Sequence, residues 1–430
     1  MLNLGSPSSV STLGFGRQSE DLNVPGYGRH MPDSVGDSAW GWRTATAELV
    51  ARTRFITPSR LPEAVAAAAA TAGSATTLYL VDHEQRRLRP FPPGGDPLHV
   101  DASPAGTAFR TTTPERDGAR LWNPLLDGSE RLGVLGLDSA AADRSDPAVR
   151  VEVDRFVALV GHLIAVMSAY GDAFEHVRRT RPMSAAAELV WQMLPPLTYG
   201  ADSFVISAIL QPVYAVGGDG FDYGVSESTL YLGIYDSTGH HLRAGLTTAV
   251  TLSAVRAARR AGSGVLEQAT AADAALAEEF DDSRFTTAVL AGVDLASGAV
   301  HYVNAGHPPP LVLRGDRLVA TLDGGRRLPL GLGGIAGGPT TPGKLRLEAG
   351  DRLLAYSDGV VDALDRDGEP FGVDGLTALA LRHAADDLPA PETLRRMNHD
   401  VLSRQDGPSA DDATLLLVEW SGEAVRRLAP

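Results

Sequence analysis

The sequence contains no cysteine among its 430 residues. This excludes disulfides, thiol nucleophiles, cysteine-ligated zinc and iron–sulfur clusters. Lysine is nearly absent as well: Lys344 is the only one, so arginine carries almost all of the positive charge. The 38 basic residues are outnumbered by 53 acidic ones, and the formal charge is −15. Such an acidic chain argues against binding to nucleic acid and against docking on an anionic membrane.

Long apolar runs are missing too. The sequence has no stretch of about 18 apolar residues, and its N-terminus has no basic segment followed by an apolar one. We therefore expect a cytoplasmic protein without a membrane span. Hydrophobic residues make up 43% of the chain and charged residues 21%, which is ordinary globular usage. At this length, two or three domains are expected.

The N-terminal part of the chain changes character near residue 40. Residues 1–40 are rich in Ser, Gly, Pro and Asp and are expected to form a disordered tail. Residues 41–171 then read as an α+β unit. Its helices are predicted at 41–54, 61–73 and about 147–170, and its strands at 76–82 and in RLRPF, with a hairpin at 120–138. Over roughly 43–168 this order resembles a GAF domain, which implies a sensor domain with a small-molecule or protein effector.

Residues 172–197 are predicted to form a helical connector that ends at the Pro195–Pro196 pair. The apolar seam expected on it consists of Ala185, Leu189, Trp191, Met193 and Leu194. Two interpretations stay open: the seam packs on the following domain, or it is a signalling helix at a homodimer interface. Residues 422–430 are left as a C-terminal tail.

Residues 198–421 alternate strands, helices and glycine turns. Strands are predicted in DSFVISAILQP, TLYLGIYD, TTAVLAGVDLASG, AVHYVNAG, PLVLRG, KLRLEAGDRLLAYSD and ATLLLVEW, and helices at 242–261, 264–279 and 391–404. Many strands with a few long helices indicate two packed sheets flanked by helices.

Four acidic motifs stand in this region, and three of them place an aspartate at the end of an apolar strand. The motifs are VGGDGFDY with Asp219 and Asp222, LYLGIYDSTGHH with Asp236, RLLAYSDGVVDAL with Asp358 and Asp362, and SADDATLLLVEW with Asp411 and Asp412. Each motif alone is typical of a turn or loop. Strand ends can converge at one edge of a core, and clustered buried anions are tolerable only with cations between them. Oxygen ligands favour Mg²⁺ or Mn²⁺, and two such ions about 4 Å apart can hold phosphate oxygens.

The whole series of motifs, with NAGHPPP, LPLGL and GEPFG in order, resembles the SpoIIE-type (RsbU-like) branch of the PPM/PP2C metal-dependent Ser/Thr phosphatases. The resemblance covers about 198–421 and implies an α-β-β-α sandwich. It implies that Asp236 bridges two Mn²⁺ or Mg²⁺ ions and that the carbonyl of Ser237 helps to hold the second. Asp358 and Asp411 would bind the first ion, and Asp219 would contact a metal or a metal-bound water.

The resemblance also implies accessory roles for Asp222, Asp362 and Asp412, with a third-metal role for Asp362. Thr238 stands where some relatives have a histidine that serves as general acid. His240 is the nearest substitute, and a structural role for it stays open. In NAGHPPP, Asn304 and His307 either shape the edge of the site or form a turn that ends a strand.

The implied reaction is hydrolysis of phosphoserine or phosphothreonine on a regulatory protein, such as a phosphorylated STAS-type anti-anti-sigma factor, under control of the GAF-like domain. Two alternatives remain. One is a catalytically inactive phosphatase-like scaffold. The other, more remote, is a diguanylate cyclase, because GGDGF resembles the GGDEF signature, although Gly220 replaces the glutamate.

Overall fold

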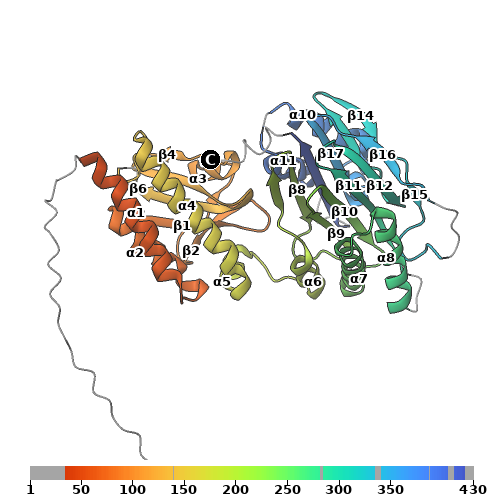
Figure 1. Ribbon diagram of the computed structural model, residues 1–430, viewed down its shortest axis with the longest axis horizontal. Helices are drawn as coiled ribbons and strands as arrows, with labels where there is room; N and C mark the ends of the chain where they lie inside the picture. The colour runs from red at the N-terminus through yellow and green to blue at the C-terminus, as the bar shows by residue number, and fades with distance from the viewer. Residues whose placement is uncertain are drawn as a thin grey trace, which may run out of the picture.

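The computed structural model describes residues 34–138, 140–280, 284–334, 340–386, 388–404 and 411–421. Two α+β parts lie side by side (Figure 1). The expected tail at residues 1–33 and the expected C-terminal tail at 422–430 lie outside the described residues. The first helix begins at Ser34, so the prediction that the tail reaches residue 40 is wrong for residues 34–40.

The N-terminal part is a six-stranded antiparallel sheet in the order β3-β2-β1-β6-β5-β4. Its strands are β1 (Thr76–Val81), β2 (Arg87–Phe91), β3 (Leu98–His99), β4 (Glu115–Asp117), β5 (Arg120–Asp127) and β6 (Glu130–Asp138). Its helices are α1 (Ser34–Thr53), α2 (Leu61–Ala69), α3 (Pro104–Thr111) and α4 (Pro147–Met167). The helices and strands expected here are present, whereas α3, β3 and β4 were not predicted. They are short, and α3 is set by a local signal: the Ser103 hydroxyl accepts a hydrogen bond from the Gly106 amide.

Helices α1, α2 and α4 cover one face of this sheet, and α3 covers the other. On the first face the buried rings of Trp42 and Phe156 meet edge to face, with centroids 5.2 Å apart. The α4 helix begins with a proline after Asp146, whose carboxylate accepts a hydrogen bond from the Ala148 amide. This part of the chain thus has a core of its own.

The connector is not one helix. It consists of α5 (Ala173–Arg178) and α6 (Ala185–Met193), and the hydroxyl of Ser184 caps the second by accepting from the Ala187 amide at 3.1 Å. The fully buried residues of α6 are Ala186, Ala187 and Val190, with Trp191, Met193 and Leu194 partly buried. The predicted seam is therefore wrong at Ala185, which is exposed. The buried face of the helix begins at the next residue, Ala186.

The C-terminal part is a sandwich of two sheets with helices outside, as expected for the fold. One sheet has the order β15-β12-β11-β10-β9, with β16 also paired to β12, and the other has the order β14-β13-β17-β18-β8-β7. Strands β9 (Asp219–Val225), β10 (Thr229–Ser237), β11 (Thr286–Asp294), β12 (Ala299–Ala305), β15 (Arg326–Arg327) and β16 (Gly343–Arg346) form the first. Strands β7 (Thr198–Ala201), β8 (Phe204–Gln211), β13 (Leu311–Arg314), β14 (Arg317–Thr321), β17 (Asp351–Tyr356) and β18 (Ala413–Trp420) form the second.

Apolar side chains of both sheets fill the space between them, among them Phe221, Ile234 and Leu416. Helices α7 (His241–Arg260) and α8 (Val265–Glu279) cover the outer face of the first sheet, and α10 (Gly372–Ala384) and α11 (Ala390–Arg404) cover that of the second. Strand β9 was not predicted, because the glycines of VGGDGFDY resemble a turn. Helix α10 was not predicted either.

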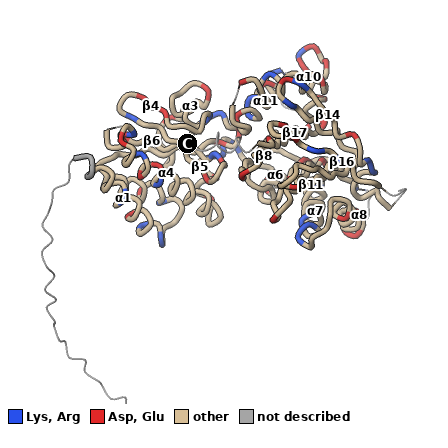
Figure 2. The backbone as a smooth tube through the Cα atoms, turned by 45° about the horizontal axis from the view of Figure 1, so that its top comes forward, with Lys and Arg blue, Asp and Glu red and all other residues tan. Residues whose placement is uncertain are grey.

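Acidic and basic residues are interspersed over both parts (Figure 2). Across the described ranges, no helix has both the length and the apolar character needed to cross a bilayer.

Candidate active site

Two of the predicted aspartates lie opposite each other on neighbouring strands. Asp219 begins β9, Asp236 lies near the end of β10, and the two are paired in the antiparallel register. Residues two positions away, Phe221 and Ile234, belong to the core between the sheets, so by alternation both carboxylates face the second sheet. Directly opposed like charges are unfavourable on a sheet. This pair therefore requires a compensating interaction.

The other aspartates reach the same place from the second sheet. Strand β17 ends one residue before Ser357, and the Ser357 amide donates to the carbonyl of Thr414 at 3.0 Å, next to the start of β18. This pairing places Asp358, the first residue of the short helix α9 (Asp358–Val361), beside Asp411 and Asp412, which precede β18. A Cβ on Gly359 would lie 1.9 Å from the carbonyl oxygen of Asp412, so only glycine permits this approach.

These carboxylates raise one another's pKa. Burial, and then the charges of Asp358, Asp411 and Asp412, raise the pKa of Asp236 to about 7. Burial and the charges of Asp236 and Asp412 raise the pKa of Asp219 well above its usual value. The charged groups that act most strongly on Asp219 and Asp236 are thus all negative. Such a cluster is favourable only when positive charge enters it.

Asp358 belongs to the same cluster. Burial, Asp411 and Asp362 raise its pKa. Asp362 is exposed one turn further on in the chain, and its amide donates to the Asp358 carbonyl at 2.8 Å. The accessory position expected for Asp362 is therefore at the solvent side of the cluster.

Asp412 has a different role from its neighbour Asp411. Its Oδ2 atom accepts hydrogen bonds from the amides of Gly217, Gly218 and Asp219, at 2.6, 2.8 and 3.2 Å. Three amide donors stabilise the carboxylate and hold the entry to β9 against the second sheet. Asp412 thus positions Asp219.

Hydroxyl groups complete the support around these carboxylates. The Thr414 hydroxyl donates to Asp219 Oδ2 at 2.6 Å, which joins the two sheets directly. The Ser237 hydroxyl lies 2.8 Å from that of Thr286 and accepts from the Thr248 hydroxyl of α7 at 2.9 Å. The side chain of Ser237 is therefore engaged away from the acidic cluster, consistent with an expected contribution from its carbonyl only. The sequence reasoning did not single out Thr414, although it stands within the DDAT motif.

Asp222 does not join the cluster, and the prediction of an accessory site role is wrong in its placement. Three residues after Asp219, it faces the opposite side of β9, towards α7. Its Oδ1 accepts from Arg256 Nη2 at 2.6 Å and its Oδ2 from Arg259 Nη1 at 2.7 Å. Arg256 also donates to the Met193 carbonyl at the end of α6. Asp222 therefore fastens α6 and α7 to the sheet.

His240 lies exposed at the start of α7, where its ring meets that of His241 edge to face with centroids 4.6 Å apart. Its backbone is near Gly217, at the entrance to the cluster.

His307 is buried, with its Nδ1 atom 2.8 Å from the Thr287 hydroxyl, and burial lowers the pKa of His307 to about 3. Thr287 is opposite Asp236 in the sheet, so His307 supports the strand next to the site. The Asn304 side chain closes the turn by bonding the backbone of His307 in both directions, at 2.9 Å.

The donor set fits hard divalent cations by its chemistry, since it consists of carboxylates and carbonyl oxygens without sulfur. Within the described part of the chain, however, no three acidic or imidazole side chains are arranged closely enough to hold an ion as they stand. The structure brings the carboxylates into mutual electrostatic range but does not close a ligand shell around one point.

The family of this region is decided by a comparison with family models. Residues 226–421 match the model of Stage II sporulation protein E (SpoIIE), a segment that includes Asp236, Asp358 and Asp411. Residues 226–421 thus form a SpoIIE-type domain. Asp219 lies just ahead of the matched residues.

Among curated proteins, Protein IcfG from Synechocystis sp. is 27% identical over 143 residues. This match covers 33% of the chain and 22% of IcfG, so the chain spans about a fifth of that relative. Among solved structures, the RsbU and RsbW domains of Rv1364c from Mycobacterium tuberculosis are 26% identical, with a TM-score of 0.45 over 53% of this chain and 63% of that one. The SiaA-PP2C domain of Pseudomonas aeruginosa is 20% identical, with a TM-score of 0.47 over 60% and 99%.

We expect Asp222→Ala to destabilise the SpoIIE-type domain by about 3 kcal/mol, because it leaves two largely buried arginines without their partner. Urea unfolding measures the loss, and Glu279→Ala, an exposed residue of α8, is the control with little change. Metal-dependent turnover per folded molecule should stay near that of the wild type. A variant of normal stability with lost turnover would place Asp222 in the catalytic machinery instead.

Proposed function

We propose that the protein is a metal-dependent phosphatase that hydrolyses phosphoserine or phosphothreonine on a regulatory protein. The observation that carries the proposal is that Asp219, Asp236, Asp358 and Asp411 lie at one end of the sandwich, where neighbouring carboxylates are within electrostatic range of one another. The charged groups around Asp236 that act on it are carboxylates, and this negative surrounding favours the binding of divalent cations. The match to the SpoIIE family model supports the same class of chemistry.

The residues have distinct proposed tasks. Asp236 lies among the other carboxylates and is the candidate for bridging two Mn²⁺ or Mg²⁺ ions, with the Ser237 carbonyl beside it. Asp358 and Asp411 would hold the first ion. When bound, such ions supply the positive charge that activates water and neutralises the phosphoryl oxygens. Thr414 and Asp412 keep Asp219 in place, and exposed His240 is a candidate proton donor to the leaving hydroxyl of the substrate.

Hydrolysis at this site needs no covalent enzyme intermediate. Water forms the new P–O bond, the ester P–O bond breaks, and a proton goes to the serine or threonine oxygen. The chain contributes positioning and electrostatic stabilisation, which suits phosphoryl transfer.

Asp358→Asn should lower Mn²⁺-dependent hydrolysis of p-nitrophenyl phosphate by roughly 100-fold, because it removes a charged metal ligand. The measurement is phosphate release against Mn²⁺ concentration, together with calorimetric titration of the metal. Glu279→Gln removes an exposed charge of the same type and should leave both unchanged. Wild-type protein that neither takes up Mn²⁺ nor releases phosphate would favour an inactive scaffold.

The substrate proposed is a phosphorylated STAS-type protein. Full-length protein with Mn²⁺ should dephosphorylate a folded phospho-STAS protein with a kcat/KM about tenfold or more above that for a phosphopeptide of the same local sequence, because only the folded partner adds a docking surface. Phosphate release on the two substrates measures this. Equal kcat/KM values would argue against a folded partner of this kind while leaving the phosphatase proposal intact.

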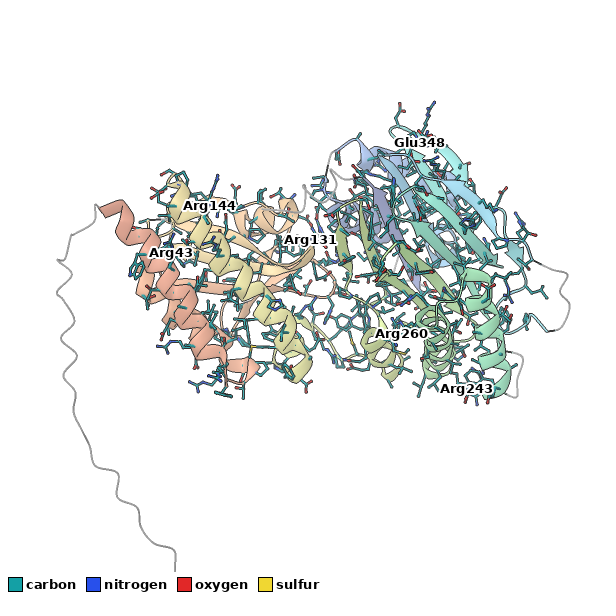
Figure 3. All side chains as sticks on the ribbon, viewed as in Figure 1. Arg43, Arg131, Arg144, Arg243, Arg260 and Glu348 are labelled. Atoms are coloured by element: carbon teal, nitrogen blue, oxygen red, sulfur yellow. The ribbon has the colours of Figure 1, made fainter. Side chains whose placement is uncertain are left out.

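We further propose that the N-terminal part, a GAF-like sensor by resemblance, acts on the phosphatase through a direct interface. The tip of the β5–β6 hairpin reaches the second part of the chain (Figure 3, at Arg131). Glu130 Oε2 accepts from the Thr198 amide at 2.6 Å, and burial raises the pKa of Glu130 to about 7. Arg131 Nη1 donates to Glu392 Oε2 on α11 at 3.2 Å.

The contact continues along α11. Arg395 is 1% exposed at its side chain, pairs with Glu392 at 2.8 Å, and donates from Nη1 to Asp101 of the N-terminal part at 3.2 Å. The apolar face of the same helix packs through Leu394 and Met397 on the sheet that contains β18. Because β18 begins directly after Asp411 and Asp412, a shift of α11 is positioned to alter the acidic cluster.

Arg131→Met should change phosphatase turnover of the full chain more than twofold, because it removes an interdomain pair worth about 1–3 kcal/mol of coupling. Glu392 keeps its partners Arg395 and Arg396, so no buried charge is left alone. Arg396→Met removes a partner of the same carboxylate from within α11 and is the matched control. Equal turnover in both variants and the wild type would refute coupling through this contact.

A further inference from the structure

The N-terminal part contains a cavity of about 360 Å³ between strand β5 and helix α4. A volume of this size is typical of small-molecule sites. Its apolar wall includes Pro124, Leu126 and Val157, and Ala158 lies exposed at its edge. The cavity lies on the face of the sheet covered by α4, and its lining includes none of the aspartates of the proposed active site.

A buried polar atom without a partner belongs to this lining. Asn123 is 1% exposed, and its Nδ2 donates to the carbonyls of Leu121 and Leu135 at 3.2 and 3.3 Å. These bonds fix the orientation of the amide. Its Oδ1 atom has no hydrogen-bond partner among the described residues. A buried acceptor left unpaired costs about 1–3 kcal/mol, which a ligand with a hydrogen-bond donor would recover.

The charged side chains around the cavity determine which charge a bound ligand can carry. Its lining includes the carboxylates of Asp127 and Asp154 and no basic side chain. Arg144 pairs with Asp154 and lies beside α4 (Figure 3), and His162 Nδ1 is 3.1 Å from Asp127. No basic side chain among the lining residues is therefore left to pair with an added anion, which would also lie close to two carboxylates.

We propose that this cavity binds a small molecule that has an apolar body and a hydrogen-bond donor and that is uncharged or positively charged. The donor bonds Asn123 Oδ1, and the apolar body packs on Leu126 and Val157. The lining residues Leu126, Asp127 and Gly128 continue into the hairpin whose other strand carries Glu130 and Arg131 to the SpoIIE-type domain. The site therefore adjoins the interdomain contact, but its ligand binding does not depend on the phosphatase activity.

The test is calorimetric titration of the full-length protein with three probes that share a 1-methylindole ring, which has no N–H donor of its own. The tryptamine probe, 1-methyltryptamine, carries an ammonium donor, the 3-ethylindole probe, 3-ethyl-1-methylindole, lacks any donor, and the indole-3-propionate probe, 1-methylindole-3-propionate, carries a carboxylate. We expect one saturable site for tryptamine, with affinity about tenfold weaker for each of the other two, a difference of about 1.4 kcal/mol.

Two variants locate the site. Ala158→Trp fills the cavity from its exposed edge and should abolish tryptamine binding. Val166→Trp, at a 43% exposed position of the same helix, is the matched control and should leave it unchanged. Asn123→Leu removes the acceptor and should weaken tryptamine to the affinity of 3-ethylindole.

Three results would overturn the proposal: no saturable heat with tryptamine, the same tryptamine affinity in Ala158→Trp as in the wild type, or indole-3-propionate binding as tightly as tryptamine. Circular dichroism establishes that each variant is folded. Because Ala158 is exposed, Ala158→Trp decides the outcome even where Asn123→Leu does not fold.

Discussion

Mutual repulsion within a cluster of carboxylates, which runs from buried Asp219 to exposed Asp411, is the constraint that organises the C-terminal part of this protein. Asp219 and Asp236 are opposed on one sheet, and Asp358 and Asp411 reach them from the other. In the interior of a protein such charges act on one another far more strongly than in water. Positive charge must therefore enter from outside, and this requirement connects the fold to the proposed metal-dependent chemistry.

The surroundings of the cluster hold these groups where repulsion would separate them. Asp412 binds three successive amides at the start of β9, and the Thr414 hydroxyl bonds Asp219 across the two sheets. On the other face of β9, Asp222 joins two arginines of α7. The three acidic residues at β9 thus have separate tasks. Asp219 faces the site, Asp412 positions Asp219, and Asp222 fastens α7 to the sheet.

The interface between the N-terminal and C-terminal parts also depends on buried charged groups that compensate one another. Glu392 and Arg395 are almost fully buried on α11 and compensate each other, while Arg131 and Asp101 add partners from the N-terminal part. Buried pairs of this kind contribute little net stability but tolerate few alternative geometries. They therefore suit a contact that transmits the state of one domain to the other, and the cavity beside β5 lies on the N-terminal side of it.

Local patterns in the sequence determined the type of most elements. The apolar runs of β8, β10, β11 and β18 and the periodicity of α4, α7, α8 and α11 predicted them correctly, because burial imposes a period of 2 or 3.6 on the chain. The single strand predicted over KLRLEAGDRLLAYSD is wrong, since it consists of β16 and β17, which belong to different sheets. The same order of motifs indicated the SpoIIE-type domain and its acidic residues. Short elements such as α3 and β4 were missed: the cap of α3 at Ser103 is a weak signal by itself, and β4 is held by its pairing with β5.

Only the tertiary structure decided what each acidic residue does. VGGDGFDY and SADDATLLLVEW each contain two neighbouring aspartates that look equivalent as sequence. The pleat of β9 directs Asp219 to the site and Asp222 to α7, and the approach of the Gly217–Gly218 backbone gives Asp412 its amide donors. The partners Arg256, Arg131 and Glu392 lie tens to hundreds of residues away. A pattern read along the chain contains no information on such long-range neighbours, because they meet only when the sheets, helices and domains have packed.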